Sequence, residues 1–274
     1  MEVNGNRFNY ELKIVSPSSP LLVFHHGGGH SLHSFTLLVD KLNYNTLTFD
    51  CRQHGQTETT NDADLSLETL TDDLVSLIQK LEYKELVLIG HSMGAPVVIS
   101  AVPRLKKVVG VIVLDVVEGT AIESLGMMMS ILMRRPKSFK SEQDAIEWSF
   151  KNGGKNLESL KISVPGQLRK VNEKYYWRTD LESSKSRLIA GWFENMSEKF
   201  LACKCAKLLV LAGADRLDKP LMIGQMQGKF QLIIIPESGH LIQEDVPEKL
   251  AVIIDEFYKR NQPLDISKIR KPLH

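Results

Sequence analysis

The stretch from residue 86 to residue 94 restricts the possible fold more than any other part of the sequence. It places Gly90-His91-Ser92-Met93-Gly94, a G-x-S-x-G pattern, directly after an apolar run and directly before a helical one. The glycines are needed because a side chain at either position would clash where the backbone turns so sharply. Ser92 would be exposed at the tip of this turn, beside a helix N-terminus that stabilises negative charge. The pattern alone also fits a glycine-rich turn with a capping serine, but the flanking elements favour a nucleophile.

Short runs rich in Val, Ile and Leu alternate with longer amphipathic stretches along most of the chain. This alternation predicts an α/β fold, and the continuous apolar character of the runs predicts mostly parallel strands buried on both faces. We expect strands at residues 21–24, 46–49, 86–89, 108–114, 208–211 and 232–235, after an N-terminal strand around 8–15. We expect helices at residues 34–42, 66–81, 93–102 and 247–259.

The alternation stops between about residue 119 and about residue 202. This segment holds helical pieces and all three tryptophans, Trp148, Trp177 and Trp192. We interpret it as a cap inserted between two strands of the sheet. Residues 1–274 are therefore expected to form one domain with helices on both faces of the sheet.

Composition excludes several classes of function. The chain has 274 residues with 43% hydrophobic and 24% charged content, which predicts a globular protein with a substantial core. A net charge of +1 gives no electrostatic reason to expect nucleic acid or an anionic membrane as a partner. No apolar run reaches the roughly 20 residues that span a bilayer.

The cysteines point to a reducing compartment. Cys51, Cys203 and Cys205 are odd in number, and the last two are too close and too isolated for a zinc site. We expect no metal, no cofactor and a cytoplasmic location. The basic cluster at residues 268–271 is a candidate nuclear address, although short tails of this kind are usually solvated.

A serine nucleophile needs a histidine base that follows it in the chain. Eight histidines compete for this role, and most lie in other loops. His240 lies after the last expected strand and before the last helix, where this arrangement places its base. We therefore assign His240 as the general base.

The acid that orients the histidine has two serious candidates. Asp115 ends the strand before the cap, and Asp215 follows the strand after it. Asp218 is a third, weaker candidate. Spacing does not decide between Asp115 and Asp215, and the others would be loop or helix-capping carboxylates.

A run of three glycines follows the first buried strand, in His26-Gly27-Gly28-Gly29-His30. Bare glycine backbone lets N–H groups approach a developing oxyanion, and the run matches an H-G-G-G oxyanion motif. We expect the Gly28 and Met93 N–H groups to be the donors. A phosphate-binding loop is disfavoured because no Gly-Lys-Ser/Thr follows.

Taken together, these motifs resemble the protein phosphatase methylesterases, which are α/β-hydrolases. The similar stretches are H-G-G-G-H-S at 26–31, G-H-S-M-G at 90–94, D-V-V-E-G-T-A at 115–121, A-I-E-W-S at 145–149, A-G-A-D-R-L-D-K at 212–219 and I-G-Q-M-Q-G-K-F at 223–230. The D-V-V-E-G-T and I-G-Q-M-Q-G-K-F stretches are specific, whereas many esterases share the serine turn. Two departures are the Ala95-Pro96 step, where the family usually has a further glycine, and the lack of an acidic insertion between Gln167 and Tyr175.

The resemblance implies a triad of Ser92, Asp115 and His240, because the family uses the aspartate of its D-V-V-E-G-T segment. It implies removal of the methyl ester from the C-terminal leucine of the protein phosphatase 2A catalytic subunit, whose tail would bind in a groove. The Met-rich residues at 127–133 are either lining of that groove or plain core. Two other functions stay open: a general carboxylesterase or lipase-like hydrolase of small esters, and a phosphatase-binding regulator that masks its partner's active site.

Overall fold

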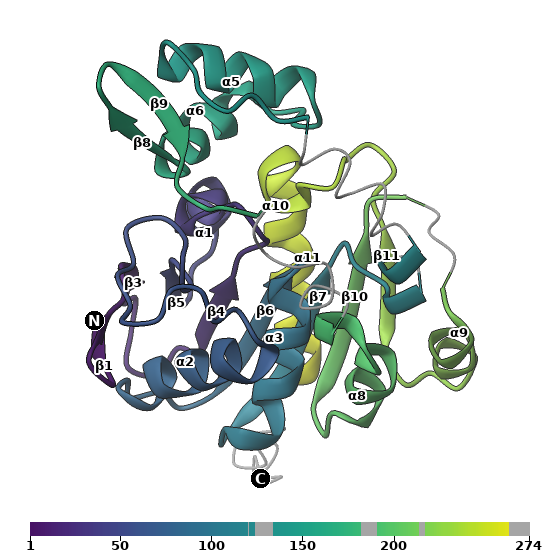
Figure 1. Cartoon of the computed structure of the whole chain (residues 1–274). Helices are drawn as coiled ribbons and strands as arrows, with labels where there is room; N and C mark the ends of the chain where they lie inside the picture. The colour runs from purple at the N-terminus through teal and green to yellow at the C-terminus, as the bar shows by residue number, and fades with distance from the viewer. Residues whose placement is uncertain (120, 124–133, 182–190, 214–216, 263–274) are drawn as a thin grey trace, which may run out of the picture.

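A computed structural model describes residues 1–119, 121–123, 134–181, 191–213 and 217–262 (Figure 1). Its centre is a seven-stranded sheet in the order β11-β10-β7-β6-β4-β5-β3. The strands are β3 (Tyr10–Lys13), β4 (Leu21–His25), β5 (Asn45–Phe49), β6 (Leu86–His91), β7 (Val108–Leu114), β10 (Ala206–Leu211) and β11 (Gln231–Ile234). Every neighbouring pair is parallel except β3 with β5. The predicted α/β class with a mostly parallel sheet is confirmed.

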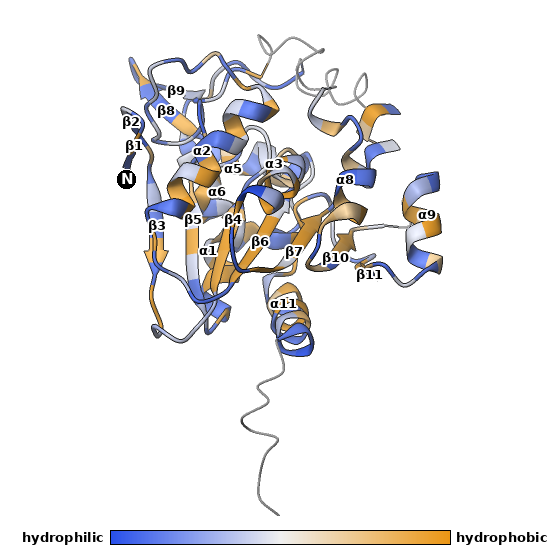
Figure 2. Cartoon of the chain, turned by 90° about the horizontal axis from the view of Figure 1, so that it is seen from below, coloured by the Kyte–Doolittle hydropathy of each residue, from blue (hydrophilic) through white to orange (hydrophobic). Residues whose placement is uncertain are grey.

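Helices cover both faces of this sheet. Helices α2 (Leu67–Gln79), α3 (Gly94–Ala101) and α8 (Met196–Ala202) pack on one face, and α1 (Thr36–Lys41) and α11 (Pro247–Asn261) on the other. Figure 2 shows the hydrophobic strands between these two helical layers. Shorter elements are η1 (Leu32–Phe35), η2 (Val102–Arg104), α9 (Lys219–Met226) and α10 (Ile242–Asp245). The four predicted helices are confirmed, with ends that differ by a few residues.

Helix α2 shows how sequence fixes such an element. The Ser66 side chain accepts a hydrogen bond from the Thr69 N–H, which caps the helix at its start. Leu70, Leu74 and Leu77 recur at helical spacing and are buried against the sheet side. The amphipathic pattern therefore decides both where the helix begins and which face it buries.

Part of the predicted insertion forms a cap above the carboxyl edge of the sheet (Figure 1). It consists of α5 (Glu142–Lys151), α6 (Leu157–Gly166) and a hairpin of β8 (Leu168–Val171) and β9 (Lys174–Trp177). These elements share a small core of their own. Helix α8 falls within the same insertion in sequence, but its Phe200 side chain joins the main core.

The topology fixes where a ligand can bind. Strand β4 is followed by β5 on one side, and the chain then crosses to β6 on the other. Parallel sheets open a crevice at the carboxyl ends of the strands where the winding direction reverses. The glycine loop after β4 and the serine turn after β6 therefore face each other. No described helix is long and apolar enough to span a bilayer.

Candidate active site

The serine turn joins β6 to α3 through a strained backbone. Ser92 has a φ of 49°, in the left-handed region that is costly for any residue except glycine. Its N–H donates to the Leu114 carbonyl at 3.1 Å, which ties the turn to strand β7. A Cβ on Gly90 would lie 2.5 Å from the Gly94 carbonyl oxygen, and one on Gly94 would collide with the His25 carbonyl. Close backbone approach therefore requires both glycines.

Asp115 and His240 form a hydrogen-bonded pair across the sheet edge. His240 Nδ1 lies 2.6 Å from Asp115 Oδ2. The other carboxylate oxygen accepts the Ala212 N–H at 2.7 Å, and the Asp115 N–H donates to the Val210 carbonyl at 2.8 Å. Strand β10 and the residue after it thus fix this aspartate from two directions, and its side chain is only 9% exposed. The His240 side chain is 54% exposed.

The residue before Ser92 holds the backbone of His240. His91 is fully buried, and its Nε2 lies 2.8 Å from the His240 carbonyl oxygen. Because a carbonyl can only accept, His91 carries its proton on Nε2, and its Nδ1 faces the Gln243 amide at 3.5 Å. Burial lowers the pKa of His91 well below its ordinary value, which keeps it neutral.

The glycine loop and the serine turn meet at the expected oxyanion position. A Cβ on Gly28 would lie 3.6 Å from Met93 Sδ and 4.0 Å from Met93 Cβ, so the two residues are neighbours. Within the described ranges, neither the Gly28 N–H nor the Met93 N–H has a hydrogen-bond partner. Two neighbouring free donors are what an oxyanion hole requires.

The cavity beside Ser92 has a volume of about 300 Å³. Residues from the sheet edge form its floor, namely Gly28, Gly29, Ser92, Met93 and His240. Apolar and aromatic side chains form most of the remaining wall, among them Trp148, Leu160, Val164, Trp177, Leu181 and Trp192. Arg135 also lines it, with its guanidinium stacked 4.0 Å from the centre of the Trp177 ring. The cavity can therefore take an apolar group next to the Ser92 side chain.

The structure brings Ser92, His240, Gly28 and Met93 to this one cavity and pairs Asp115 with His240. No hydrogen bond joins Ser92 to His240 in the part of the chain that the structure describes.

The remaining sequence candidates have other places. Asp218 caps helix α9 by accepting the Leu221 N–H at 3.0 Å. Asp215, the methionines at 127–129 and 133, and the basic cluster at 268–271 lie outside the described residues. The Ala95-Pro96 step leaves α3 intact because Pro96 lies in its first turn, where its missing N–H costs little.

Sequence reasoning did not find every residue at the site. His91 and Gln243 were not assigned, although both adjoin recognised motifs. Arg135 carries no motif signal. Glu244 is buried with its Oε2 accepting from Ser163 Oγ of the cap at 2.7 Å, and burial raises its pKa to about 7.

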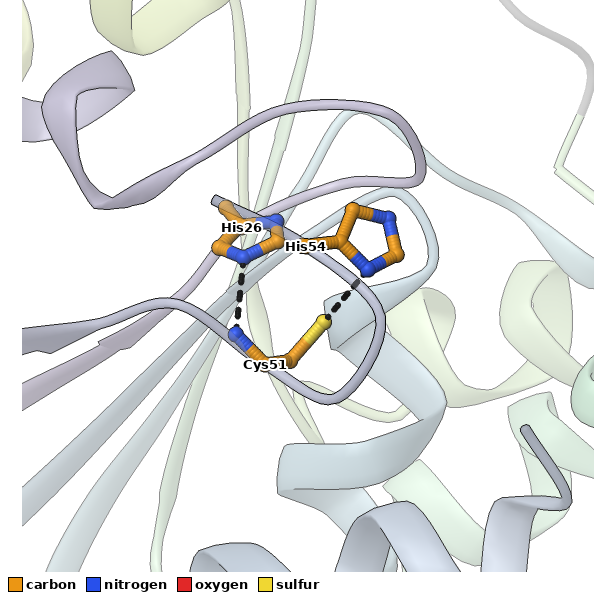
Figure 3. Close-up of side chains that lie close together, drawn as sticks. All are labelled: His26, Cys51 and His54. Carbon is orange, nitrogen blue, oxygen red and sulfur yellow. Dashed lines mark hydrogen bonds between the residues drawn. The ribbon is translucent and has the colours of Figure 1, made fainter. Parts of the chain in front are cut away.

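One cluster of side chains has the composition of a metal site. Donor atoms of His26, Cys51 and His54 lie within 4.8 Å of one another, and all three residues are buried (Figure 3). However, each ring nitrogen of His26 and His54 already has a hydrogen-bond partner in the backbone. Burial also raises the pKa of the Cys51 thiol well above its ordinary value, which disfavours the thiolate that a metal needs.

Residues 22–253 match a family model described as the alpha/beta hydrolase family. Among similar proteins, the protein phosphatase methylesterase 1 of Schizosaccharomyces pombe is 43% identical, over 96% of this chain and 81% of that protein. This chain belongs to the protein phosphatase methylesterase family of alpha/beta hydrolases. The resemblance inferred from its motifs is confirmed.

Other methylesterases of this family are longer than the chain. The Cryptococcus neoformans protein phosphatase methylesterase 1 is also 43% identical, over 88% of this chain, but the chain spans only 64% of its length.

Solved structures agree with the hydrolase fold. The E-2-(acetamidomethylene)succinate hydrolase has a TM-score of 0.75 and 18% identity, over 93% of this chain and 96% of its own. The thioesterase domain from the curacin biosynthetic pathway has a TM-score of 0.72 and 20% identity, over 93% and 97%.

Proposed function

We propose that the chain is a serine carboxylesterase that removes the methyl ester from the C-terminal leucine of the protein phosphatase 2A catalytic subunit and releases methanol. The observation that carries this proposal is the 2.6 Å pair of His240 and Asp115 at the cavity that holds Ser92. Membership of the methylesterase family supports the substrate class. The apolar cavity wall suits the side chain of a leucine.

The proposed reaction begins with the approach of the His240 imidazole to the Ser92 hydroxyl. His240 removes the hydroxyl proton while Ser92 Oγ attacks the ester carbonyl, and Asp115 holds the imidazole through Nδ1–H. The Gly28 and Met93 N–H groups stabilise the oxyanion, with each donor contributing about 3 to 4 kcal/mol to lowering the barrier.

The tetrahedral intermediate then collapses with loss of methanol, which takes its proton from His240. This leaves the peptide as an ester of Ser92. A water molecule, activated by the same imidazole, attacks this acyl-enzyme and releases the free carboxylate.

The test is to incubate the chain with methylated catalytic subunit and follow methanol release. We expect demethylation by the wild type and none by Ser92→Ala, with Ser238→Ala as a matched control outside the cavity. Failure of the wild type to demethylate would refute the proposal.

Two further measurements separate the alternatives. Brisk turnover of short acyl esters without demethylation would indicate a general esterase. Equal phosphatase binding and inhibition by the wild type and Ser92→Ala, again without demethylation, would indicate a masking regulator.

A further inference from the structure

His54 contacts the glycine loop but does not line the cavity. It belongs to the loop after strand β5 and is fully buried, with 1% of its surface exposed. The Gly29 N–H donates to His54 Nε2 at 2.8 Å. The loop after β5 therefore contacts the backbone of the loop that carries an oxyanion donor.

The glycine loop is a tight turn held at three points. The His30 N–H donates to the Gly27 carbonyl at 3.2 Å, and Gly29 has a φ of 79°, which the third position of such a turn requires. His26 Nδ1 lies 2.8 Å from the same carbonyl. The Gly28 N–H therefore lies between two held groups, the Gly27 carbonyl before it and the Gly29 N–H after it.

The hydrogen bonds of the two histidines assign their protons. Because N–H groups donate to His54 Nε2 and His26 Nε2, both rings carry their proton on Nδ1. His54 Nδ1–H then faces the Arg52 carbonyl at 2.8 Å, and Cys51 Sγ lies 3.2 Å from the same nitrogen. Each lone pair that a metal would need is already bound by a backbone N–H. The cluster in Figure 3 is thus complete as a hydrogen-bonded support.

We infer that His54 is a positioning residue for the oxyanion hole: its Nε2 takes the Gly29 N–H and so aims the neighbouring Gly28 N–H into the cavity. His26 supports the same turn from Gly27. This inference rests on the proposed role of Ser92 as nucleophile, but not on the identity of the ester.

The test uses a fluorophosphonate, which labels an activated serine and places a negatively charged oxygen in the oxyanion hole. The measured quantity is the pseudo-first-order rate constant for labelling of Ser92, because irreversibly misfolded protein lowers the amplitude of labelling and leaves this rate constant unchanged. His54→Leu removes the acceptor, whereas His54→Gln keeps an oxygen near the position of Nε2. His33→Leu, in η1 and outside the cavity lining, is the control.

Loss of a whole oxyanion donor costs about 10²- to 10³-fold in rate, so a displaced donor should cost somewhat less. We expect labelling to slow about 10- to 100-fold in His54→Leu and to remain within about threefold of wild type in His54→Gln and His33→Leu. The ratio of inhibition constants for a peptidyl trifluoromethyl ketone and the peptide acid should change with it, because only the ketone forms an oxyanion.

Wild-type labelling by His54→Leu would overturn the inference, as would equal losses in His54→Gln and His54→Leu. One equivalent of tightly bound zinc in the wild type, with slower labelling after its removal, would show a metal site instead. A wild type that is labelled but does not demethylate the phosphatase would sink the proposed substrate alone.

Discussion

Asp115 has a backbone conformation that few aspartates adopt. Its φ of 52° is left-handed, and the hydrogen bonds to Val210 and Ala212 compensate the cost. The carboxylate is thereby fixed before His240 reaches it. A residue held in this way orients its partner at little further entropic cost.

Replacing this carboxylate with an amide should therefore affect the orientation of the His240 imidazole without affecting the stability of the fold. In Asp115→Asn the side-chain oxygen can still accept the Ala212 N–H, so we expect thermal unfolding to change little. The amide disfavours the Nδ1–H form of His240, and kcat should fall by about 10³- to 10⁴-fold, as for the equivalent change in serine proteases. Steady-state ester hydrolysis measures the fall, with Asp215→Asn as the control. An active Asp115→Asn together with an inactive Asp215→Asn would instead assign the acid role to Asp215.

Residue types and order single out Ser92 and His240 as candidates, but they do not choose between two aspartates at strand ends. Asp115 and Asp215 follow strands that are adjacent in the sheet. The sequence alone therefore allows either carboxylate to reach the same imidazole. Only the family resemblance favours Asp115. The distinction depends on hydrogen bonds across β7 and β10, which no local pattern encodes.

At the scale of elements, long periodic segments were predictable and short hairpins were not. The two-residue turn of the β8–β9 hairpin uses Asn172 and Glu173, both with positive φ. Glutamate rarely occupies such a position, so the turn carries a weak signal. The β1–β2 hairpin (Glu2–Val3 and Asn6–Arg7) is the exception, because it turns at Asn4-Gly5, which is a strong hairpin signal in the sequence.

Helix α10 is joined to the cap by a carboxyl group with little access to water. Glu244 Oε1 lies 3.8 Å from His30 Nδ1, and Oε2 accepts from Ser163 in α6. Burial lowers the pKa of His30 to about 3 and raises that of Glu244 to about 7, so the uncharged form of each is favoured.

This carboxyl group should make stability depend on pH. Since the pKa of Glu244 is raised from 4.5, the folded state holds a proton that the unfolded state releases between about pH 4.5 and 7. Its contribution to stability is present below that window and is lost, by a few kcal/mol, as pH rises through it. Urea unfolding at pH 5 and 8 should show this loss in the wild type relative to Glu244→Gln. A difference between the two proteins that is the same at both pH values would contradict the expectation.

At the scale of the whole molecule, the buried histidines around one sheet edge change stability with pH in the direction opposite to Glu244. Burial lowers the pKa values of His25, His26, His30, His54 and His91. The unfolded chain takes up protons on these groups below about pH 6.5, and the folded chain does not. Stability conferred by the neutral rings is therefore complete above that pH and falls as the solution becomes more acidic.

The slope of the unfolding free energy against pH is proportional to the number of protons that the chain takes up when it unfolds. Between pH 6 and 5 we expect a net uptake of about three to four protons on unfolding, since five histidines are partly opposed by Glu244. Denaturant titrations at several pH values give the slope, and His54→Gln should reduce it by about one. A slope below one proton would mean that the rings are not held neutral.

The segments that form the candidate active site are synthesised at very different times. His91, the residue before Ser92, is hydrogen-bonded to the carbonyl of His240, which lies 149 residues after His91 in the chain. A chain growing from the ribosome thus carries its serine turn and its glycine loop long before it carries His240. If Ser92 and His240 act as proposed, the newly made chain cannot act on esters until the segment beyond β11 has been made and has docked.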